Sequence, residues 1–515
     1  MLDIEQRESS RHQIQRELDN EKTSAQRNEL GQFSTPNGLA VEILRETLSL
    51  FPKRKKIRFL DPAFGTGVFF SALVLELGNS RIGKAQAFEI DPHYGIPSEA
   101  LWGDSITIDL EDFTSREPPA AERHKFNLVV CNPPYVRHHH IAGSDKERLK
   151  NLAVDYAGAS FSGLTGLYCY FVAICHGWLQ KGALGVWLIP SEFMDVNYGS
   201  ALKQYLLDKV TLLRIHRFDP NDTQFDDALV SSAVVWFLND EAGADHEVKF
   251  TFGGSLDSPE VVRMVSRPTL AEEKKWTRFP LSESRNGRSG PVLGDYFSVK
   301  RGIATGDNKF FVMTPEQIEE RKLPISQFIP ILPSPRYLES DDLEADSNGN
   351  PLLDKRLFLL NCRLPLDVVR GQYPSLYDYL KAGEEGGVSE KYLCSSRKLW
   401  YLQEIREPCR FFCTYIGRSD AGRPSFRFIL NNSSAIAANS YLMLYPKPEF
   451  TQLIMTDASL ANNIAKELRA ISNEALLEEG RVYGGGMHKL EPRELTNVGA
   501  PGIATLLDPY RQHLI

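Results

Sequence analysis

The stretch Asn132 to Tyr135, which directly follows an apolar run in "NLVVCNPPY", combines two rigid hydrogen-bond acceptors with one flat ring. Pro133 and Pro134 fix the backbone and remove N–H donors, so the Asn132 side-chain oxygen and the Pro133 carbonyl can both accept hydrogens from one amino group. Such acceptors free the lone pair of an aromatic amine, which is otherwise delocalised into its ring. Because the Tyr135 ring can stack on that amine's ring, the stretch predicts a site that activates a planar amine.

A glycine turn and three acids upstream predict a site for a nucleoside with an amino-acid tail. "FLDPAFGTGVFF" places Asp61 at a strand end and Gly65 and Gly67 in the turn into a helix, where a ligand can approach the backbone. Glu89 ends the next strand, where it can accept ribose hydroxyls, and Asp104 in "LWGDSI" is expected to end a third strand beside the adenine. Each acid alone reads as a cap or turn residue, but the ordered set favours S-adenosylmethionine. The third glycine and the lysine of a pyrophosphate or triphosphate site are missing.

The elements that must position these residues are short β-branched strands alternating with helices over residues 31–252. Strands are predicted at "KIRFL", "KAQAFEI", "KFNLVVC", "GALGVWLI" and "VSSAVVWF". The alternation predicts an α/β domain, a doubly wound Rossmann-like fold with a mostly parallel sheet covered on both faces. Residues 1–30 are polar and helix-favouring, and are expected to form an N-terminal helical arm.

The remainder of the chain predicts a second domain. Residues 253–290 are polar and rich in Ser, Gly and Pro, which predicts a linker. Over residues 291–515 short strands, long loops and a helical tail predict a C-terminal α+β domain. Arginines and aromatic residues mix between Arg397 and Arg427, which suits nucleic acid, but a solvated arginine face over an aromatic core explains the mixture equally well.

Composition limits the class of protein. The chain has 515 residues, a net charge of −8 and 42% hydrophobic residues, as in soluble globular proteins of two or more domains. The negative charge argues against a nucleic-acid coat protein but permits one basic cleft. The start lacks an apolar signal segment, and the longest apolar run is too short to span a bilayer. We therefore expect a cytoplasmic protein without a membrane segment.

Several motifs in order resemble those of one enzyme family. "GQFSTP", "DPAFGTGVF", "FEIDP", "GDS", "NPPYVR" and "FDDALVSSAVV" look like the motifs of the γ-class N6-adenine DNA methyltransferases of restriction–modification systems, of the Eco57I and TaqI type. The resemblance covers nearly the whole chain from Gly31, and the ordered set is specific although NPPY alone is not. It implies S-adenosyl-L-methionine as cofactor, double-stranded DNA as substrate, and methylation at N6 of an adenine flipped out of the duplex.

The resemblance also implies roles for individual residues. The residues expected to hold the cofactor are Thr35, with Gln32 and Ser34 beside it, Asp61, Ala63, Gly65, Gly67, Glu89, Ile90, Asp104 and Asn132. The residues expected to hold the target adenine are Asn132, Pro133, Pro134, Tyr135 and, opposite Tyr135, Phe225 with Phe218 as the alternative. Thr35 is implied near the methionine carboxylate and Glu89 at the ribose. Asp104 is implied at the adenine amine, with Ile90 packed on the adenine.

The C-terminal domain resembles the family's target-recognition domain in two stretches, residues 294–312 and 480–495. Both are Gly-rich and basic, which suits close approach to phosphate, and both also read as tight hairpins. The residues expected to contact DNA are Lys300, Arg301, Lys309, Lys489 and Arg493. We expect a monomer, with any cognate restriction endonuclease on a separate polypeptide.

Histidine and cysteine patterns do not indicate a metal site. His138, His139 and His140 are consecutive, so they point in different directions and cannot share one metal, and no Glu or Cys follows at ligand spacing. The seven cysteines contain no CxxC pair, which predicts reduced thiols. The histidines are expected in a loop over the DNA backbone or the mouth of the cofactor site.

Other functions remain open on the sequence. An NPPY methyltransferase can act on guanine N2 of RNA, on cytosine N4 or on a protein glutamine. A different class is a non-catalytic DNA-specificity subunit, against which the intact glycine turn and NPPY stretch argue. The large C-terminal domain favours DNA over the RNA and protein substrates, since those need only a small appendage.

Overall fold

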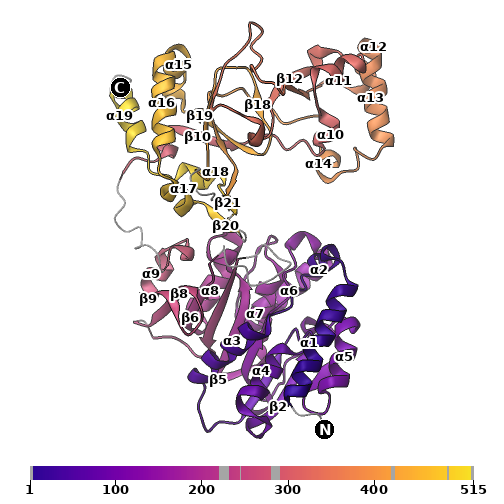
Figure 1. The fold of residues 1–515 in the computed structure, drawn as a ribbon, viewed down its shortest axis with the longest axis vertical. Coiled ribbons are helices and arrows are strands. Elements are labelled where there is room, and N and C mark those ends of the chain that lie inside the picture. The colour runs from indigo at the N-terminus through magenta and orange to yellow at the C-terminus, as the bar shows by residue number, and fades with distance from the viewer. Residues whose placement is uncertain are drawn as a thin grey trace. The chain divides into compact units, whose positions relative to one another are not determined.

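The computed structural model describes residues 4–219, 231–243, 245–279, 290–418, 424–483 and 487–511. The chain divides into two compact units (Figure 1). One unit holds the described residues up to 279, and the other holds nearly all of those from 290 onward. The prediction of at least two cores from the length of the chain agrees with this division.

The described part of the first unit is built on a nine-stranded sheet. Its strands are β1 (Ile57–Asp61), β2 (Ile82–Phe88), β3 (Thr107–Asp109), β4 (Phe126–Cys131), β5 (Leu179–Pro190), β6 (Thr211–Arg217), β7 (Ser232–Leu238), β8 (Glu247–Gly254) and β9 (Pro259–Ser266). They lie in the order β3-β2-β1-β4-β5-β7-β6-β8-β9. The first five neighbours are parallel, whereas β7 is antiparallel to both β5 and β6. The carboxyl ends of β1 to β4 therefore share one edge.

Helices cover both faces of this sheet. They are α1 (Ile4–Glu21), α2 (Ser24–Leu30), α3 (Asn37–Leu50), α4 (Val68–Leu77), α5 (Pro92–Trp102), α6 (Gly143–Ala157), α7 (Leu167–Cys175), α8 (Ser200–Asp208) and α9 (Arg267–Glu272). Along β4, Leu128 and Val130 enter the core formed with α3, α4 and α5, while Val129 and Cys131 enter the core formed with α6, α7 and α8. A strand buried on both faces reads as a continuous apolar run, and the predicted doubly wound α/β class is confirmed.

The structure differs from the predicted linker over residues 253–290. β9 pairs antiparallel with β8 and is the edge strand of the first unit's sheet. Val265, Leu270 and Trp276 are buried in the same core as α6 and α7. The linker expectation is therefore wrong for residues 253–279, because an exposed edge strand is as polar in composition as a linker. The rest of the stretch, up to residue 289, lies outside the described residues.

The second unit is an α+β domain, as predicted. Its strands are β10 (Phe297–Arg301), β11 (Val312–Met313), β12 (Phe328–Leu332), β13 (Asp342–Leu343), β14 (Leu357–Leu360), β15 (Phe411–Thr414), β16 (Ile416–Arg418), β17 (Phe428–Asn431), β18 (Ile436–Ala437), β19 (Tyr441–Pro446), β20 (Arg481–Tyr483) and β21 (Met487–Lys489). Its helices are α10 (Asn308–Phe311), α11 (Pro315–Glu320), α12 (Leu366–Gln372), α13 (Pro374–Glu385), α14 (Tyr392–Ser395), α15 (Pro448–Thr456), α16 (Ala458–Ala470), α17 (Asn473–Glu479), α18 (Pro492–Thr496) and α19 (Pro501–Arg511). In Figure 1, α15, α16 and α19 gather at one end of this unit and α11, α12 and α13 at the other. Within the described ranges, no helix of either unit is long and apolar enough to cross a membrane.

Candidate active site

A cavity of about 830 Å³ lies in the first unit at the carboxyl ends of β1, β2, β3 and β4. Open α/β sheets bind ligands at this edge, and the volume suits a nucleoside with a tail. The predicted residues on its wall are Gln32, Ser34, Thr35, Ala63, Gly65, Glu89, Ile90, Asn132 and Pro134. Four other predicted residues do not line the cavity but are close in sequence to residues that do: Asp61, Gly67, Pro133 and Tyr135. Phe225 lies outside the described residues.

The turn between β1 and α4 brings backbone to the cavity. Gly65 and Gly67 have φ angles of +56° and +84°, in the left-handed region that side chains disfavour. A Cβ on Gly67 would lie 2.5 Å from the Phe64 ring, whereas one on Gly65 would meet open space. Glycine is therefore required at position 67 by close packing as well as by conformation, and Gly65 leaves its backbone open to a ligand.

Two buried carboxylates hold this turn. Asp61, at the end of β1, accepts the Ala63 N–H at 3.1 Å. Glu89 follows β2, and its two oxygens accept the N–H groups of Gly65 at 2.8 Å and Asp91 at 2.9 Å. Burial raises the pKa of both carboxyl groups. Each carboxylate oxygen has a second lone pair, so Glu89 can still accept hydroxyl groups from a ribose.

The acid at the carboxyl end of the third strand is not Asp104. Asp104 lies in the turn that precedes β3, where the Arg7 guanidinium of α1 donates to it at 2.7 Å and lowers its pKa to about 2. Asp104 precedes β3 and does not line the cavity, so the prediction that it ends the third strand is wrong. After β3 the chain reaches the cavity at Glu111 and Asp112, and Asp112 accepts the Thr114 N–H at 2.8 Å. The pattern "TIDLED" holds both the three-residue strand and Asp112, and the turn at Asp104 lies before this strand.

The N-terminal helices also contribute to the wall, which the sequence reasoning missed. Gln15 of α1 and Lys22, which directly follows α1, line the cavity. The Lys22 ammonium donates to Gln32 at 3.0 Å and pairs with Asp91. The sequence signal for this arrangement is that Gln15 and Lys22 are seven residues apart, the spacing of two helical turns, in a stretch that favours helix. The predicted helical arm is thus part of the cofactor unit.

Asn132, at the end of β4, is held in one orientation. Its Nδ2 donates to the Phe33 carbonyl at 2.9 Å and to Thr35 Oγ1 at 3.0 Å. Because a carbonyl can only accept, the amide must turn its nitrogen toward Phe33. Asn132 Oδ1 is buried and has no hydrogen-bond partner among the residues that the structure describes. An acceptor fixed in this way is available to a donor that enters the site.

The Tyr135 side chain lies beside this amide in the apolar core. Tyr135 is 8% exposed, and its hydroxyl donates to the Leu188 carbonyl at 3.1 Å. Its ring centre is 5.6 Å from that of Phe33, with the planes tilted by 45°. The Tyr135 N–H donates to the Gly31 carbonyl at 3.0 Å, which ties the segment before α3 to the NPPY stretch.

Gly31→Ala is expected to destabilise the protein. Gly31 has a φ of +65°, and a Cβ there would lie 2.4 Å from the Tyr135 backbone nitrogen. Strain at such a φ costs about 1–2 kcal/mol before any clash is counted. The free energy of unfolding in urea should therefore fall by at least about 1 kcal/mol. Gly38→Ala in α3 is the matched control, because a Cβ there meets open space. If Gly31→Ala were as stable as Gly38→Ala, the close approach would be refuted.

His138, His139 and His140 form one short 3-10 turn, and only His140 of the three lines the cavity. Across the described ranges, no three His, Cys, Asp or Glu side chains gather as a metal site. Because His140 is exposed and lines the cavity, this residue of the turn lies where the cavity opens to solvent.

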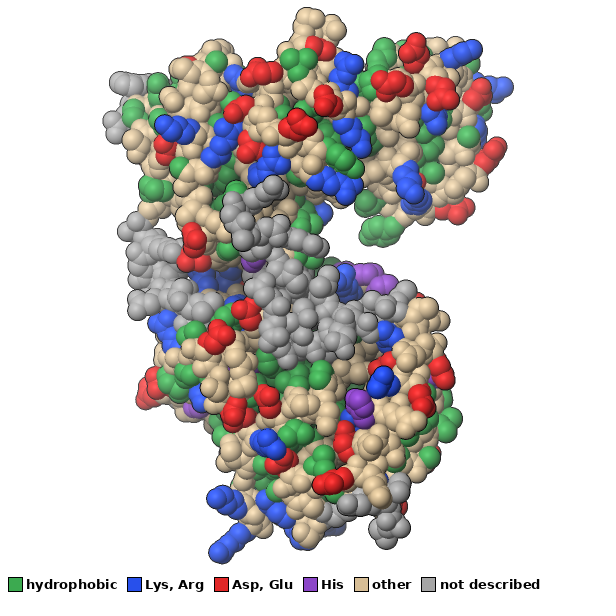
Figure 2. Space-filling view, in the orientation of Figure 1, with side chains coloured by type: hydrophobic (Ala, Val, Ile, Leu, Met, Phe, Trp, Pro, Cys, Tyr) green, Lys and Arg blue, Asp and Glu red, His purple; other side chains and the backbone are tan. Residues whose placement is uncertain are grey.

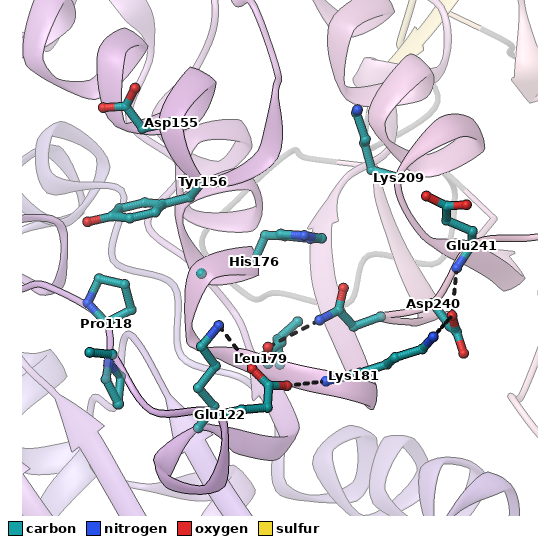
Figure 3. Close-up of a pocket in the computed structure, with 15 residues that line it drawn as sticks. Pro118, Glu122, Asp155, Tyr156, His176, Leu179, Lys181, Lys209, Asp240 and Glu241 are labelled. Atoms are coloured by element: carbon teal, nitrogen blue, oxygen red, sulfur yellow. Dashed lines mark hydrogen bonds and ion pairs between the residues drawn. The ribbon is translucent and has the colours of Figure 1, made fainter.

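A second cavity, of about 750 Å³, lies in the same unit at the opposite edge of the sheet (Figure 3). Its wall is formed where β4 and β5 begin and β7 ends. Four of its charged residues are engaged with one another: Glu122 pairs with Lys125 at 3.3 Å and accepts the Lys181 N–H at 2.6 Å, and the Lys181 ammonium lies 3.5 Å from Asp240. The amino ends of parallel strands are not where such sheets bind cofactors, so the first cavity is the candidate site.

In the second unit, the two stretches predicted to contact DNA meet at Tyr415. The Arg301 guanidinium lies 4.0 Å from the centre of the Tyr415 ring, and the Lys489 ammonium lies 5.0 Å from it. Lys489 also pairs with Glu491 at 2.9 Å. The other candidates, all of them exposed, are Lys300, Lys309 and Arg493. Figure 2 shows basic and acidic side chains interspersed over the visible face of this unit.

Arginines of the Arg397–Arg427 region serve the fold of the second unit. Arg397 donates to the Ala304 carbonyl at 2.9 Å, and Arg410 donates to Asn432 at 2.6 Å. Arg427 donates to Asp341 at 2.8 Å and to two backbone carbonyls. These three arginines are half-buried and donate within the fold, so they differ from the solvated face that the sequence offered as the alternative to DNA contact.

Two models of one family match the chain in order. "Eco57I restriction-modification methylase" matches residues 36–225, and "Type II methyltransferase M.Eco57I, C-terminal domain" matches residues 273–513. Type II methyltransferase M.AccI of Acinetobacter calcoaceticus is 25% identical over 505 residues, which cover 94% of this chain and 87% of that protein. Type II methyltransferase M.XamI of Xanthomonas campestris pv. amaranthicola is 27% identical over 458 residues, which cover 87% and 81%.

The fold has a counterpart among solved structures. The type IIL restriction-modification enzyme MmeI in complex with DNA matches with a TM-score of 0.53 at 13% identity, over 89% of this chain and 64% of that one. This chain thus spans less than two thirds of the length of that enzyme. Because the two family models follow each other through both units, this chain belongs to the Eco57I family of type II restriction–modification methyltransferases.

Proposed function

We propose that this protein, a site-specific DNA methyltransferase that uses S-adenosylmethionine, methylates N6 of an adenine flipped out of duplex DNA. The observation that carries the proposal is the orientation of Asn132. Its buried Oδ1 has no partner among the described residues, while its nitrogen is held by Phe33 and Thr35. A buried acceptor left unpaired costs about 1–3 kcal/mol, so this arrangement is satisfied when an amine donor binds.

The wall of the first cavity fits S-adenosylmethionine. The Gly65 backbone faces open space, which admits the methionine end of the cofactor, and Glu89 keeps acceptor capacity for a ribose. Ile90 is apolar, lies on the wall and is 67% exposed, so an adenine ring can cover it. When bound, the cofactor supplies an electrophilic methyl group.

The NPPY stretch prepares the target amine. Asn132 Oδ1 and the Pro133 carbonyl accept the two N6 hydrogens, which keeps the nitrogen lone pair out of the ring and available to a methyl group. The proton that N6 loses leaves along its hydrogen bond to one of these oxygens and passes on to water, since a carbonyl oxygen is too weak a base to keep it. Tyr135, with Phe225 as the opposite face, stacks on the flipped base.

Labelling identifies the methylated atom. Purified protein is incubated with radiolabelled S-adenosylmethionine and duplex DNA, and the DNA is digested to nucleosides. Label is expected in N6-methyladenine. Label in N4-methylcytosine, or only in RNA or protein, overturns the adenine assignment. Cofactor binding without label in any substrate would identify a non-catalytic specificity subunit instead.

Arg301→Ala is expected to weaken DNA binding through loss of a phosphate contact. Arg301 is exposed and converges with Lys489 on Tyr415, so both stretches present positive charge at one place. The slope of log affinity against log salt should shrink by roughly 1, with little dependence on DNA sequence. Arg321→Ala is the matched control, since Arg321 is an exposed arginine of the same unit outside both stretches. Equal salt slopes for Arg301→Ala and the wild type would remove Arg301 from the interface.

A further inference from the structure

A directed chain of hydrogen bonds runs from the cofactor turn into α1 and out to the segment before α3. Arg11 Nη1 donates to Thr66 Oγ1 at 3.1 Å. Thr66 Oγ1 donates to Gln15 Oε1 at 2.5 Å, and Gln15 Nε2 donates to Ser34 Oγ at 2.8 Å. Thr66 lies between the two glycines of the turn, so the chain begins at the backbone that faces the cofactor.

The role of each group in this chain is fixed by its chemistry. An arginine can only donate, so the Thr66 hydroxyl must accept from Arg11 and give its single hydrogen to Gln15. That contact sets the Gln15 amide with its oxygen toward Thr66 and its nitrogen toward Ser34 and Asp19. The Ser34 hydroxyl donates in turn to Asp19 at 2.7 Å, so Gln15 and Asp19 hold Ser34 together. Arg11 is 2% exposed and is held by both oxygens of Glu8 at 2.7 Å, which makes the start of the chain rigid.

The other end of the chain reaches the segment that orients Asn132. Ser34 stands between Phe33 and Thr35, the residues that accept both hydrogens of the Asn132 amide. A shift of this segment turns the amide and moves Asn132 Oδ1. Gln15 thus joins the turn that faces the cofactor to the segment that aims the acceptor.

We propose that Gln15 is a positioning residue that couples cofactor binding at the turn to the orientation of Asn132. The proposal rests on the proposed function of Asn132. When the turn is held by bound cofactor, Thr66 fixes Gln15 and Gln15 fixes Ser34, so the Asn132 acceptor is aimed once methyl donor is present. A residue that only built the cavity wall would affect cofactor affinity but not the transfer step.

Gln15→Ala separates these two roles. The dissociation constant of S-adenosylmethionine is measured by calorimetry, and the single-turnover rate of DNA methylation is measured at saturating cofactor. We expect the constant to rise a few-fold and the rate to fall roughly tenfold, since small displacements of reacting groups cost rates of this size. Gln13→Ala is the matched control, because Gln13 is exposed on the same helix and bonds only to Glu17 among the interactions that the structure shows for it. Both quantities should stay unchanged in that variant.

Ser34→Ala tests the route. The Ser34 hydroxyl is exposed, so its loss does not threaten folding. We expect Ser34→Ala to slow transfer with a smaller effect on cofactor affinity, and Gln15→Ala/Ser34→Ala to be no slower than Gln15→Ala, because both act through one path. If Gln15→Ala does not fold, as judged by its melting curve, the single-turnover rate of Ser34→Ala alone decides whether the proposed coupling holds.

Three results would overturn the coupling. They are an unchanged single-turnover rate in Gln15→Ala, an unchanged rate in Ser34→Ala, and effects that add in the double variant. In each, wild-type protein still forms N6-methyladenine and the proposed function stands. If wild-type protein forms none, the proposed function fails, and the cofactor affinities of Gln15→Ala and wild type then report only on the cavity wall.

Discussion

Asn132→Ala is expected to slow methyl transfer by at least about a hundredfold while S-adenosylmethionine still binds within a few-fold of the wild-type affinity. Alanine removes the acceptor for one N6 hydrogen, and the amine lone pair then stays delocalised in the base. The cofactor loses little, because Gly65 and Glu89 on other strands keep the turn and the ribose site. Single-turnover rates at saturating cofactor, with calorimetric affinities, measure both quantities.

Two further variants sharpen this expectation. Asn151→Ala, an exposed asparagine of α6, should leave rate and affinity unchanged. Asn132→Asp keeps the shape of the side chain but turns a carboxylate oxygen toward the Phe33 carbonyl, so it should also be slow. If Asn132→Ala kept the wild-type rate, or lost cofactor binding together with the rate, the role assigned to its oxygen would be wrong.

The strand ends that form the cavity could be predicted from the sequence because long apolar runs end at polar residues there. "KFNLVVC" is buried on both faces as β4, and Asn132 follows directly. The same pattern located β1, β2 and the glycine turn, and with them the convergence of Gly65, Glu89 and Asn132 on one cavity. A parallel sheet brings such ends together whatever the details of its helices.

Asp104 and the linker show where local pattern is insufficient. β3 has only three residues, so its end could not be told from the turn that precedes it. β9 carries an edge-strand pattern of half-buried and exposed residues that composition cannot distinguish from a linker. The contacts of α1 join residues such as Gln15 and Thr66, which are 51 positions apart, and no periodicity reports such pairs.

Glu89→Gln is expected to weaken cofactor binding by about tenfold to a hundredfold. Both Glu89 oxygens accept backbone N–H groups, from Gly65 and Asp91. An amide keeps one acceptor and turns the other into a donor that faces an N–H. The amide nitrogen can no longer accept a ribose hydroxyl, so that hydroxyl has no acceptor in the complex, which costs about 1–3 kcal/mol, and each 1.4 kcal/mol is about a tenfold change in affinity. Calorimetry with S-adenosylmethionine measures the change, and Glu99→Gln, an exposed glutamate of α5, is the control.

The titration of Glu89 predicts opposite pH dependences for cofactor affinity and for the stability of the cofactor-free protein. Burial raises the pKa of Glu89, so the ionised acceptor is lost, and cofactor affinity falls, as pH drops through a value above that of an ordinary glutamate. The free energy of unfolding without cofactor changes in the opposite direction. The native state binds the Glu89 proton more tightly than the unfolded chain does, so unfolding becomes easier as pH rises through the same window. Glu89→Gln should flatten both curves over the pH range above the titration of an ordinary glutamate, because an amide does not titrate. A wild-type affinity that did not change with pH would mean that Glu89 does not bind the cofactor as a carboxylate.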